Sequence, residues 1–344
     1  MERTYHSEPI EKNTKYRMEY EDSVASFLEN EKLLAEKERE NFISPKTYKE
    51  NVEKYRELFI KQLGFPLQKK RDCPILIEKN LVVCDKNVNI YRMQFAFSNG
   101  IKGYGIYFEQ LDTSKNTPFI IGLHGGDGTP ELVSSIHDNS ANYNHLIRRM
   151  TDRGANVFVP QLLLWKKETY GGKYVREHVD GKVRQLGGSI TALELFLLQG
   201  YLDYFIQQES INQDKIGVAG LSYGGMYALH FAAIEKRVKA CYSCSWVCDG
   251  FTYSWADWSY QNAQKAFSIA ETAALVAPRA LSIAMGDKDE LFDANLTKKE
   301  CSRIKEFFKA FDAEENLQVV IFDGVHELDK GESELDFLFF NLAK

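Results

Sequence analysis

The sequence is poor in the features that mark special classes of protein. Its 344 residues contain no apolar run that approaches the roughly 18–20 residues needed to span a bilayer. Acidic residues outnumber basic ones, 49 to 43, and the formal charge of -6 argues against a nucleic-acid-binding protein, which would carry a basic stripe. Residues 1–22 lack the apolar core of a signal peptide. We therefore expect a cytoplasmic protein with neither a membrane nor nucleic acid as its partner.

Cysteines are few and scattered. In a chain of this length the pattern indicates reduced thiols of a cytoplasmic protein rather than a disulfide framework. Cys241-x-x-Cys244-x-x-x-Cys248 superficially resembles a metal site, but on a strand Cys241 and Cys244 point to opposite faces, and no fourth ligand is near. We expect buried thiols and no metal or cofactor. The six cysteines are Cys73, Cys84, Cys241, Cys244, Cys248 and Cys301.

Residues 1–72 differ from the rest of the chain, because they are rich in charge and hold equal numbers of basic and acidic side chains. From Thr47 to Leu63 the apolar positions follow helical spacing, after Ser44-Pro45 as a start signal and before Gly64 as a stop signal. We predict two amphipathic helices laid against the main body. Their role stays open between a solvated arm, a surface for homo-oligomer formation and a lid. The apolar stripe that suggests the earlier helix runs through Val24, Phe27, Leu28 and Leu34.

From Pro74 the pattern becomes that of an α/β protein. Residues 75–83, 88–97 and 103–108 have the character of strands. The alternation of strands and helices that follows predicts a mostly parallel central sheet, with antiparallel strands at its N-terminal side and helices on both faces. We expect one domain at 73–344 after a helical extension at 1–72. The six later strand segments are 119–123, 157–160, 216–221, 238–245, 280–285 and 319–322.

The segment Gly220-x-Ser222-x-Gly224 lies directly after a predicted strand and before a helical segment. A serine on such a sharp turn has its hydroxyl exposed, and side chains at the flanking glycines would collide with the strand or the helix. Free N–H groups at the start of the helix then face the negative charge that develops in acyl transfer. Ser222 is therefore our candidate nucleophile.

A nucleophilic serine needs a base and an acid that orients the base. The turn of Ser222 resembles that of α/β-hydrolases, in which the acid and then the histidine follow the serine along the chain. That order leaves His230 and His326 as candidates for the base. His230 lies eight residues along the helix that Ser222 opens, roughly 12 Å away, so His326 remains.

The acid is expected in the loop of carboxylates that follows the strand 280–285. We prefer Asp289, three residues after the turn glycine Gly286. Asp287 is the nearest alternative, and Asp249, at the end of the preceding strand, is a more distant one.

The loop that begins at His124-Gly125-Gly126 follows a strand and is rich in glycine. In enzymes with a serine on a strand-to-helix turn, the residue after the nucleophile and a residue of such a loop donate backbone N–H groups to the tetrahedral oxyanion. Here these would be Tyr223 and Gly126. A phosphate-binding loop is unlikely to explain the glycines, because no Gly-Lys-Ser/Thr follows.

With these pieces in order, residues 74–344 resemble the α/β-hydrolase superfamily, and within it the group of dienelactone hydrolases and acetyl xylan esterases, including prolyl-oligopeptidase-type catalytic domains. The resemblance implies a serine hydrolase with the triad Ser222, Asp289 and His326, which we expect to cleave esters, among them acylated carbohydrates or other small esters. A hydrolase of short peptides and a hydrolase-fold binding protein with an unreactive serine are the alternatives. The matching stretches are Leu123-His-Gly-Gly, Gly220-Leu-Ser-Tyr-Gly-Gly225, Ala277-Pro-Arg-Ala-Leu281 with Gly286-x-x-Asp289, and Gly324-Val-His-Glu327.

Two long connections, 165–188 and 250–274, mix aromatic side chains with glycine and charge. They follow strands, and open α/β sheets bind ligands at the carboxyl ends of their strands. Trp165, Trp255 and Trp258 are therefore candidate substrate contacts, although aromatic residues there are as often part of a local core. Arg184 either orients an anionic substrate group or holds a loop through a salt bridge, and we favour the structural role.

Overall fold

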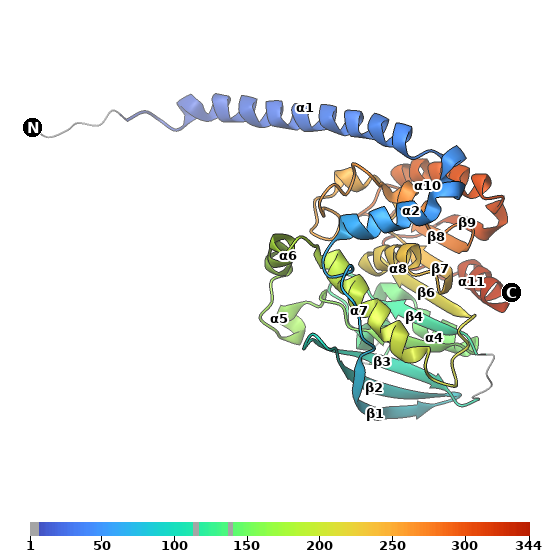
Figure 1. Cartoon of the computed structure of the whole chain (residues 1–344). Coiled ribbons are helices and arrows are strands. Elements are labelled where there is room, and N and C mark those ends of the chain that lie inside the picture. The colour runs from blue at the N-terminus through green and yellow to red at the C-terminus, as the bar shows by residue number, and fades with distance from the viewer. Residues whose placement is uncertain (1–6, 113–116, 137–139) are drawn as a thin grey trace, which may run out of the picture.

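A computed structural model describes residues 7–112, 117–136 and 140–344 (Figure 1). Its centre is a nine-stranded sheet in the order β1-β2-β3-β5-β4-β6-β7-β8-β9. All nine predicted strands are present, with ends that differ from the prediction by one or two residues. The strands are β1 (Ile75–Asp85), β2 (Val88–Ala96), β3 (Lys102–Gln110), β4 (Phe119–Leu123), β5 (Asn156–Pro160), β6 (Ile216–Leu221), β7 (Val238–Cys244), β8 (Ala280–Gly286) and β9 (Leu317–Phe322).

The pairing of the strands agrees with the predicted mixed sheet. β1, β2, β3 and β5 pair in antiparallel fashion, whereas β5, β4, β6, β7, β8 and β9 are parallel. Every residue of β4, β5, β6 and β8 is buried, and so is every residue of β7 except Lys239, since helices cover both faces of these strands. The carboxyl ends of the parallel strands therefore meet at one edge of the sheet, which is where α/β proteins bind ligands.

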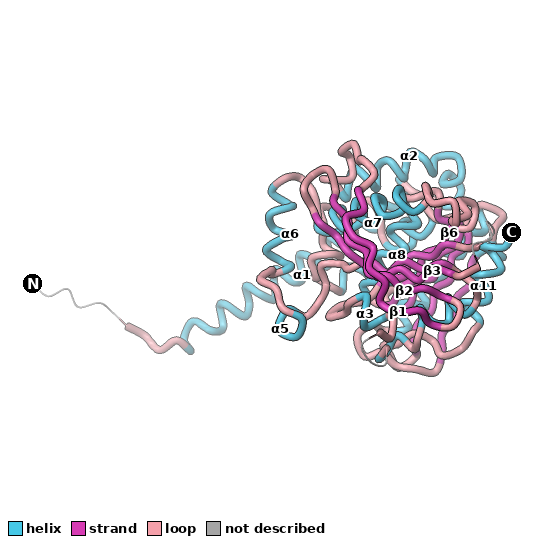
Figure 2. The backbone as a smooth tube through the Cα atoms, turned by 90° about the horizontal axis from the view of Figure 1, so that it is seen from below, coloured by secondary structure: helices cyan, strands magenta, loops and turns pink. Residues whose placement is uncertain are grey.

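The helices form two layers, each with its own hydrophobic core. Figure 2 shows the sheet between them. One core includes side chains of α2, α7, α8, α9 and α10, and the other includes side chains of α4 and α11. The helices from α3 onward are α3 (Pro130–Val133), α4 (Leu146–Asp152), α5 (Lys167–Tyr170), α6 (Arg176–Gln185), α7 (Ile190–Phe205), α8 (Tyr223–Ile234), α9 (Ile269–Ala274), α10 (Ala294–Ala310) and α11 (Ser333–Ala343), with the 3-10 helices η1 (Ala141–Tyr143), η2 (Gly250–Thr252) and η3 (Glu314–Asn316).

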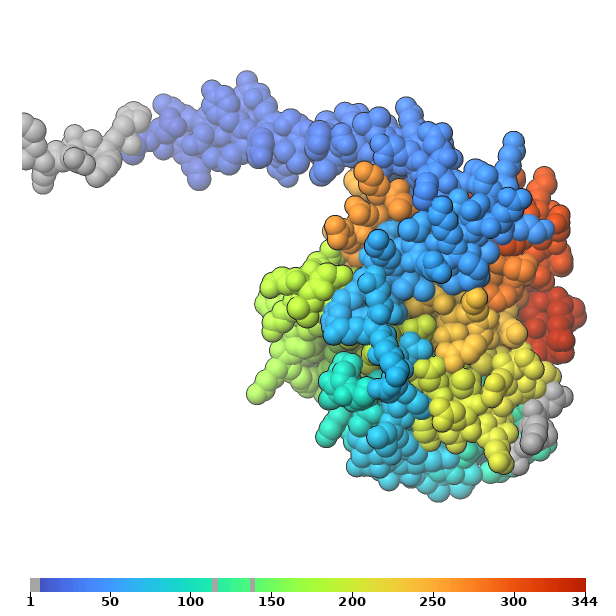
Figure 3. Space-filling model, viewed as in Figure 1, coloured from blue at the N-terminus to red at the C-terminus, as the bar shows by residue number. Residues whose placement is uncertain are grey.

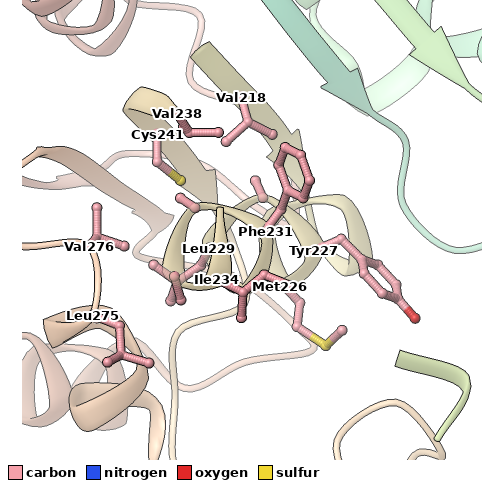
Figure 4. Packing of buried hydrophobic residues seen from close by; sticks show 14 of the residues in the cluster. Val218, Met226, Tyr227, Leu229, Phe231, Ile234, Val238, Cys241, Leu275 and Val276 are labelled. Atoms are coloured by element: carbon pink, nitrogen blue, oxygen red, sulfur yellow. The ribbon is translucent and has the colours of Figure 1, made fainter. Parts of the chain in front are cut away.

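Helix α8 lies at the centre of the first core, where nearly all of its residues are buried. Its side chains pack against β6 through Val218 and against β7 through Val238 and Cys241 (Figure 4). A helix that is apolar all round, such as this one, must be enclosed on every side. The residue that precedes α8 is Ser222, so the candidate nucleophile is held by one of the most rigidly packed elements of the fold.

The two predicted N-terminal helices are present, α1 (Glu11–Phe42) and α2 (Pro45–Leu63), but they behave differently. Helix α2 belongs to the first core, where Tyr48, Tyr55 and Phe59 are buried. Helix α1 projects away from the body, so the expectation that both helices lie against it is wrong for most of α1 (Figure 1). The prediction was wrong for α1 because amphipathicity shows that a helix has an apolar side but does not show what covers that side. The domain boundary near residue 72 stays a prediction.

Within the residues that the structure describes, no helix combines the length and the apolar character that crossing a membrane requires. All six cysteines are free thiols, and Cys241, Cys244, Cys248 and Cys301 are buried. Cys241 packs in one core and Cys244 in the other, so the two thiols point to opposite faces of the sheet, as predicted.

Candidate active site

Ser222 is the turn residue between β6 and α8. Its backbone has φ 59° and ψ -124°, in the left-handed half of the conformational map, which a residue with a side chain rarely adopts. The Ser222 N–H donates to the carbonyl of Cys244 on the neighbouring strand at 2.9 Å, which holds the turn in place. Strained backbone of this kind persists where the surrounding structure enforces it, and it is common at functional sites.

The flanking glycines explain the spacing of the motif. A Cβ added to Gly220 would lie 2.4 Å from backbone atoms of Gly224, and one added to Gly224 would lie 2.3 Å from the carbonyl oxygen of Leu123. Neither distance leaves room for a side chain. The turn can therefore bring Ser222 to the end of β4 and to the loop that follows it only with glycine at both positions.

His326 and Asp289 form a hydrogen-bonded pair on the loops that follow β9 and β8. The Nδ1–H group of His326 donates to Oδ2 of Asp289 at 2.9 Å. The carboxylate is inaccessible to solvent, and only 9% of the histidine side chain is exposed. This contact fixes the tautomer of the imidazole, so that Nε2 is left as the proton acceptor.

The Asp289 carboxylate is held in its charged form. Burial by itself would raise its pKa, but the hydrogen bond and the charge of His326, together with N–H groups of Leu291 and Phe292, lower the pKa below the usual value for aspartate. Oδ1 accepts both backbone groups, at 2.9 and 3.0 Å. One oxygen of Asp289 is thus anchored to its own loop and the other is available to the imidazole.

The other two candidate carboxylates lie elsewhere. Asp287 accepts a hydrogen bond from the N–H of Gly324 at 3.2 Å and is exposed. Asp249 caps η2 and forms a salt bridge with Lys32 of α1 at 2.6 Å. Of the three, Asp289 is the one that contacts the imidazole of His326.

Helix η1 holds the loop of His326 close to the turn of Ser222. Nδ2 of Asn142 donates to the carbonyl of His326 at 3.0 Å, and the hydroxyl of Tyr143 accepts the N–H of Gly125 at 2.7 Å. Gly125 in turn packs on Ser222, since a Cβ added there would lie 3.2 Å from that of Ser222. Within the described residues Ser222 Oγ makes no hydrogen bond, which leaves its hydroxyl free to turn toward a base. Such contacts are often formed only when substrate is bound.

The two residues that were predicted to supply oxyanion donors, Gly126 and Tyr223, lie next to each other. A Cβ added to Gly126 would lie 3.4 Å from the ring of Tyr223. Tyr223 is the first residue of α8, so its N–H has no partner within the helix. No hydrogen bond uses the N–H of Gly126 or of Tyr223 in the described part of the chain. Both groups are therefore available to an oxygen atom bound next to Ser222.

His124 anchors the loop that carries Gly126. Its Nε2 accepts the N–H of Leu162 at 3.0 Å, and its Nδ1–H donates to the carbonyl of Gly125 at 2.9 Å. Complete burial lowers the pKa of His124 to about 4, so the ring stays neutral at physiological pH. The histidine thus has a structural role and connects the loop after β4 to the chain after β5.

Two of the three candidate tryptophans line the same side of the site. Trp255 stacks on Tyr223 with ring centres 5.8 Å apart, and Trp258 meets the same ring edge-on at 4.7 Å. Phe292, whose ring contacts Trp258, lies 5.7 Å from the imidazole of His326. A continuous aromatic wall therefore runs from the residue after Ser222 to His326.

Trp165 lies on the other side of the loop after β4, where it forms a bridge with Asp127. It helps to line a cavity of about 340 Å³. The cavity combines aromatic rings with hydroxyl, amide and carboxylate groups, and its other lining residues are Tyr104, Thr129, Glu131, Gln161, Tyr170 and Gly171.

The sequence did not reveal Arg176, a buried cation behind this site. Its Nε donates to Oδ2 of Asp257 at 3.0 Å, and the guanidinium also contacts Oδ1 of Asp257, the hydroxyl of Tyr227 and Glu194. The Cζ atom of its guanidinium lies 6.0 Å from the centre of the Tyr223 ring. The sequence gives no sign that this arginine is special, because it stands among other charged residues of a polar loop and its partners lie on other segments.

Arg184 has the structural role that we favoured. It forms a salt bridge with Asp180 one turn earlier and donates to the carbonyls of Ala256 and Ser259. No cluster of three metal-ligating side chains occurs among the described residues.

No family model matches the sequence, and no curated protein matches it. Solved structures match it at low identity. A Bacteroides fragilis protein assigned as an acetyl xylan esterase is 14% identical, with a TM-score of 0.68 over 84% of this chain and 81% of that one. A glucuronoyl esterase from Solibacter usitatus is 12% identical, with a TM-score of 0.64 over 84% and 91% of the two chains. Acetyl xylan esterase 1 from a Thermoanaerobacterium species is 14% identical, with a TM-score of 0.58 over 86% and 93%.

These similarities extend over most of both chains. Together with the strand order and the serine on its turn after β6, they identify the architecture of this protein as the α/β-hydrolase fold.

Proposed function

We propose that the protein is a serine esterase that cleaves carboxylic esters, with Ser222, His326 and Asp289 as its catalytic triad. The observation that carries the proposal is the 2.9 Å contact between Asp289 and the imidazole of His326, at the edge of the sheet where β6 presents Ser222. The similar fold of solved esterases supports it.

In the proposed reaction, Oγ of Ser222 attacks the acyl carbon while Nε2 of His326 takes the hydroxyl proton. Asp289 stabilises the imidazolium that results. The protonated histidine then gives the proton to the leaving alcohol, and an acyl-enzyme remains on Ser222. A water molecule, activated by the same histidine, releases the acid and restores the serine.

The N–H groups of Tyr223 and Gly126 would bind the oxyanion of each tetrahedral intermediate. Neither group donates a hydrogen bond in the described part of the chain, and Gly126 lies against the ring of Tyr223, the residue that follows Ser222. One such donor is typically worth on the order of 100–1000-fold in rate. The reaction then requires no metal and no organic cofactor.

The substrate we propose is an ester of a small, polar alcohol, and an acylated carbohydrate fits best. The cavity beside Trp165 offers both aromatic faces and hydrogen-bonding groups, which is the mixture that a sugar ring requires. Trp255 and Trp258 would contact the acyl side, where the wall between Tyr223 and His326 is apolar. The names of the solved structures, acetyl xylan esterase and glucuronoyl esterase, point to the same class.

A fluorophosphonate probe tests the proposal directly. We expect it to label Ser222 stoichiometrically and to fail with Ser222→Ala, and His326→Ala should slow labelling by several orders of magnitude. If the wild-type protein took up no label, the proposed enzymatic activity would be refuted. A panel of nitrophenyl esters, sugar acetates and short peptides then separates an esterase from a peptidase.

A cytoplasmic location also belongs to the proposal, and the six free thiols support it. We also propose that the protein associates with itself through its N-terminal helices. The geometry of α1 suggests how two copies would be arranged.

A further inference from the structure

Helix α1 is the least covered element of the fold. Its 32 residues stand out from the body along most of their length (Figures 1 and 3). Ile10 and nine large apolar side chains of the helix are exposed. Seven of the nine fall on one side at helical spacing. All of them except Phe42, the last residue of the helix, form what we call the α1 stripe: Tyr16, Tyr20, Val24, Phe27, Leu28 and Leu34.

The exposure of this stripe requires an explanation. Helices in water take most of their stability from packing an apolar face, and the first half of α1 packs on nothing among the described residues. Within the stripe, Tyr16 and Tyr20 are 70% and 72% exposed. A contiguous apolar surface of this kind usually marks a site of association.

The second half of α1 forms one wall of a cavity of about 690 Å³. Leu28 and Leu34 face into it from the helix, and Phe251 and Tyr253 line it from the segment that follows β7. Salt bridges fix the distance between the walls: Lys32 pairs with Asp249 at 2.6 Å, and Arg39 pairs with Glu271 at 3.4 Å. The stripe is therefore continuous with an open apolar cavity that a protruding helix could fill.

We propose that two copies of this chain associate through α1, with the two helices antiparallel and the two-fold axis between Phe27 and Leu28. The protruding half of each helix then lies along the second half of the other and fills its cavity. The surface is the same in both copies, as a two-fold interface demands.

In this register Phe27 lies opposite the second copy's Leu28 at the axis, and Tyr20 lies close to the second copy's Leu34. Val24 comes opposite the second copy's Glu31, which lines the cavity. Arg17 comes opposite the second copy's Glu38, which gives two ion pairs per dimer. Among the residues that the structure describes, Arg17 donates only to groups of the segment 10–14, and Glu38 pairs only with Lys265, at 3.8 Å.

The extent and the charge of the surface favour a second copy over a membrane. Covering both stripes and cavities removes on the order of 1,000 Å² from water, which reaches the lower range of specific interfaces. Helices that lie on membranes are rich in lysine and arginine on their polar side, whereas α1 has more acidic than basic residues. An acidic helix would be repelled by anionic lipid.

The dimer would also brace the candidate active site. Lys32 and Arg39 tie α1 to the segment 249–271, and that segment carries Trp255 and Trp258. The second copy's helix would hold the outer side of the same segment.

Sedimentation velocity of the full-length protein tests the proposal, and adjacent leucines supply a matched pair of variants. Leu34 and Leu33 are 52% and 53% exposed, but Leu34 belongs to the stripe, whereas Leu33 lies about 100° further round the helix and outside the stripe. We expect the wild type and Leu33→Glu to be dimers at micromolar concentration. Leu34→Glu should weaken the dimer at least tenfold, and Phe27→Glu, at the axis, should leave monomers. A monomeric wild type, or equal dissociation by Leu33→Glu and Leu34→Glu, would overturn the proposal.

A charge exchange tests the antiparallel register. Arg17→Glu alone and Glu38→Arg alone each place like charges opposite each other, and we expect either to weaken the dimer several-fold. Mixing the two variants allows a heterodimer in which both pairs are restored, and this should recover the wild-type affinity. A mixture no stronger than its components would reject the register. Binding of a monomeric wild type to phosphatidylserine vesicles through the stripe would instead assign the surface to a membrane.

Discussion

Arg176 and Asp257 join the two long connections at the carboxyl edge of the sheet. The arginine belongs to α6 and the aspartate to the segment after β7, and Nε of Arg176 donates to Oδ2 of Asp257 at 3.0 Å. Between them they also contact Tyr227, one turn beyond Tyr223 on α8. The pair thus fixes the segment that carries Trp255 and Trp258 relative to the helix that begins after Ser222.

We expect Arg176→Lys to lower kcat/KM for an ester substrate about tenfold and to change the tryptophan fluorescence. Lysine keeps the charge but loses the planar fork that contacts both carboxylate oxygens. The measurement is steady-state kinetics together with emission spectra. Lys182→Arg is the control, since Lys182 lies on the same helix and its side chain is exposed. Equal losses in the two variants would show that Arg176 has no special part in positioning the aromatic wall.

Asp289→Asn should reduce kcat by roughly three to four orders of magnitude, as in triads whose acid is made neutral. Asparagine cannot stabilise the imidazolium, and it can hold the ring in the wrong tautomer. Asp287→Asn should change kcat by less than threefold, because Asp287 contacts the backbone of Gly324 and not the imidazole. Rates of hydrolysis of a nitrophenyl ester decide the matter. If Asp287→Asn were the more damaging change, the acid would have been assigned to the wrong residue.

Stability should fall as the pH drops from about 6.5 toward 4, because of buried histidines. Burial lowers the pKa of His230 to about 4, with its Nδ1–H donating to the carbonyl of Met226 at 2.9 Å. The unfolded chain therefore binds a proton that the folded chain does not, and each such histidine costs about 2 kcal/mol between pH 7 and pH 5. His124 has the same direction of shift.

Urea unfolding at pH 7 and at pH 5 measures this effect. His230→Gln removes one titrating group and should make the loss of stability about 2 kcal/mol smaller. His145→Gln, at an exposed histidine, is the control and should leave the pH dependence as it is. A loss of stability that His230→Gln does not reduce would mean that other groups are responsible.

Two glycine substitutions should change the stability of the protein in opposite directions. Gly224→Ala should destabilise by more than about 2 kcal/mol, because its Cβ would lie 2.3 Å from the carbonyl oxygen of Leu123. Gly181→Ala should stabilise by about 0.5–1 kcal/mol, because Gly181 is inside α6 with no atom within 4 Å of an added Cβ. Thermal unfolding of both variants checks the pair. A stable Gly224→Ala protein would show that the turn at Ser222 can relax.

The sequence alone determined the class of fold. It also supplied the candidate serine, acid and histidine in their order along the chain. Short apolar runs and the turns between them are local signals, which is why all nine strands were located. The spacing of Gly220 and Gly224 marked the turn at Ser222, and elimination along the chain left His326. The carbonyl of Leu123 that excludes a side chain at Gly224 lies on β4, which the local pattern did not show. The acid was harder to choose, because Asp287 and Asp289 lie in the same loop and sequence distance does not show which of them reaches the imidazole.

Only the tertiary structure decided the relationships between distant segments. Arg176 and Asp257 are 81 residues apart, and neither has a neighbour in sequence that announces the pair. Periodicity placed an apolar side on both N-terminal helices, but the structure packs α2 in the core and leaves the α1 stripe exposed. The physical reason is the same in both cases. The pattern along a chain records which side chains avoid water, whereas the partner that shields them is set by how the whole chain folds.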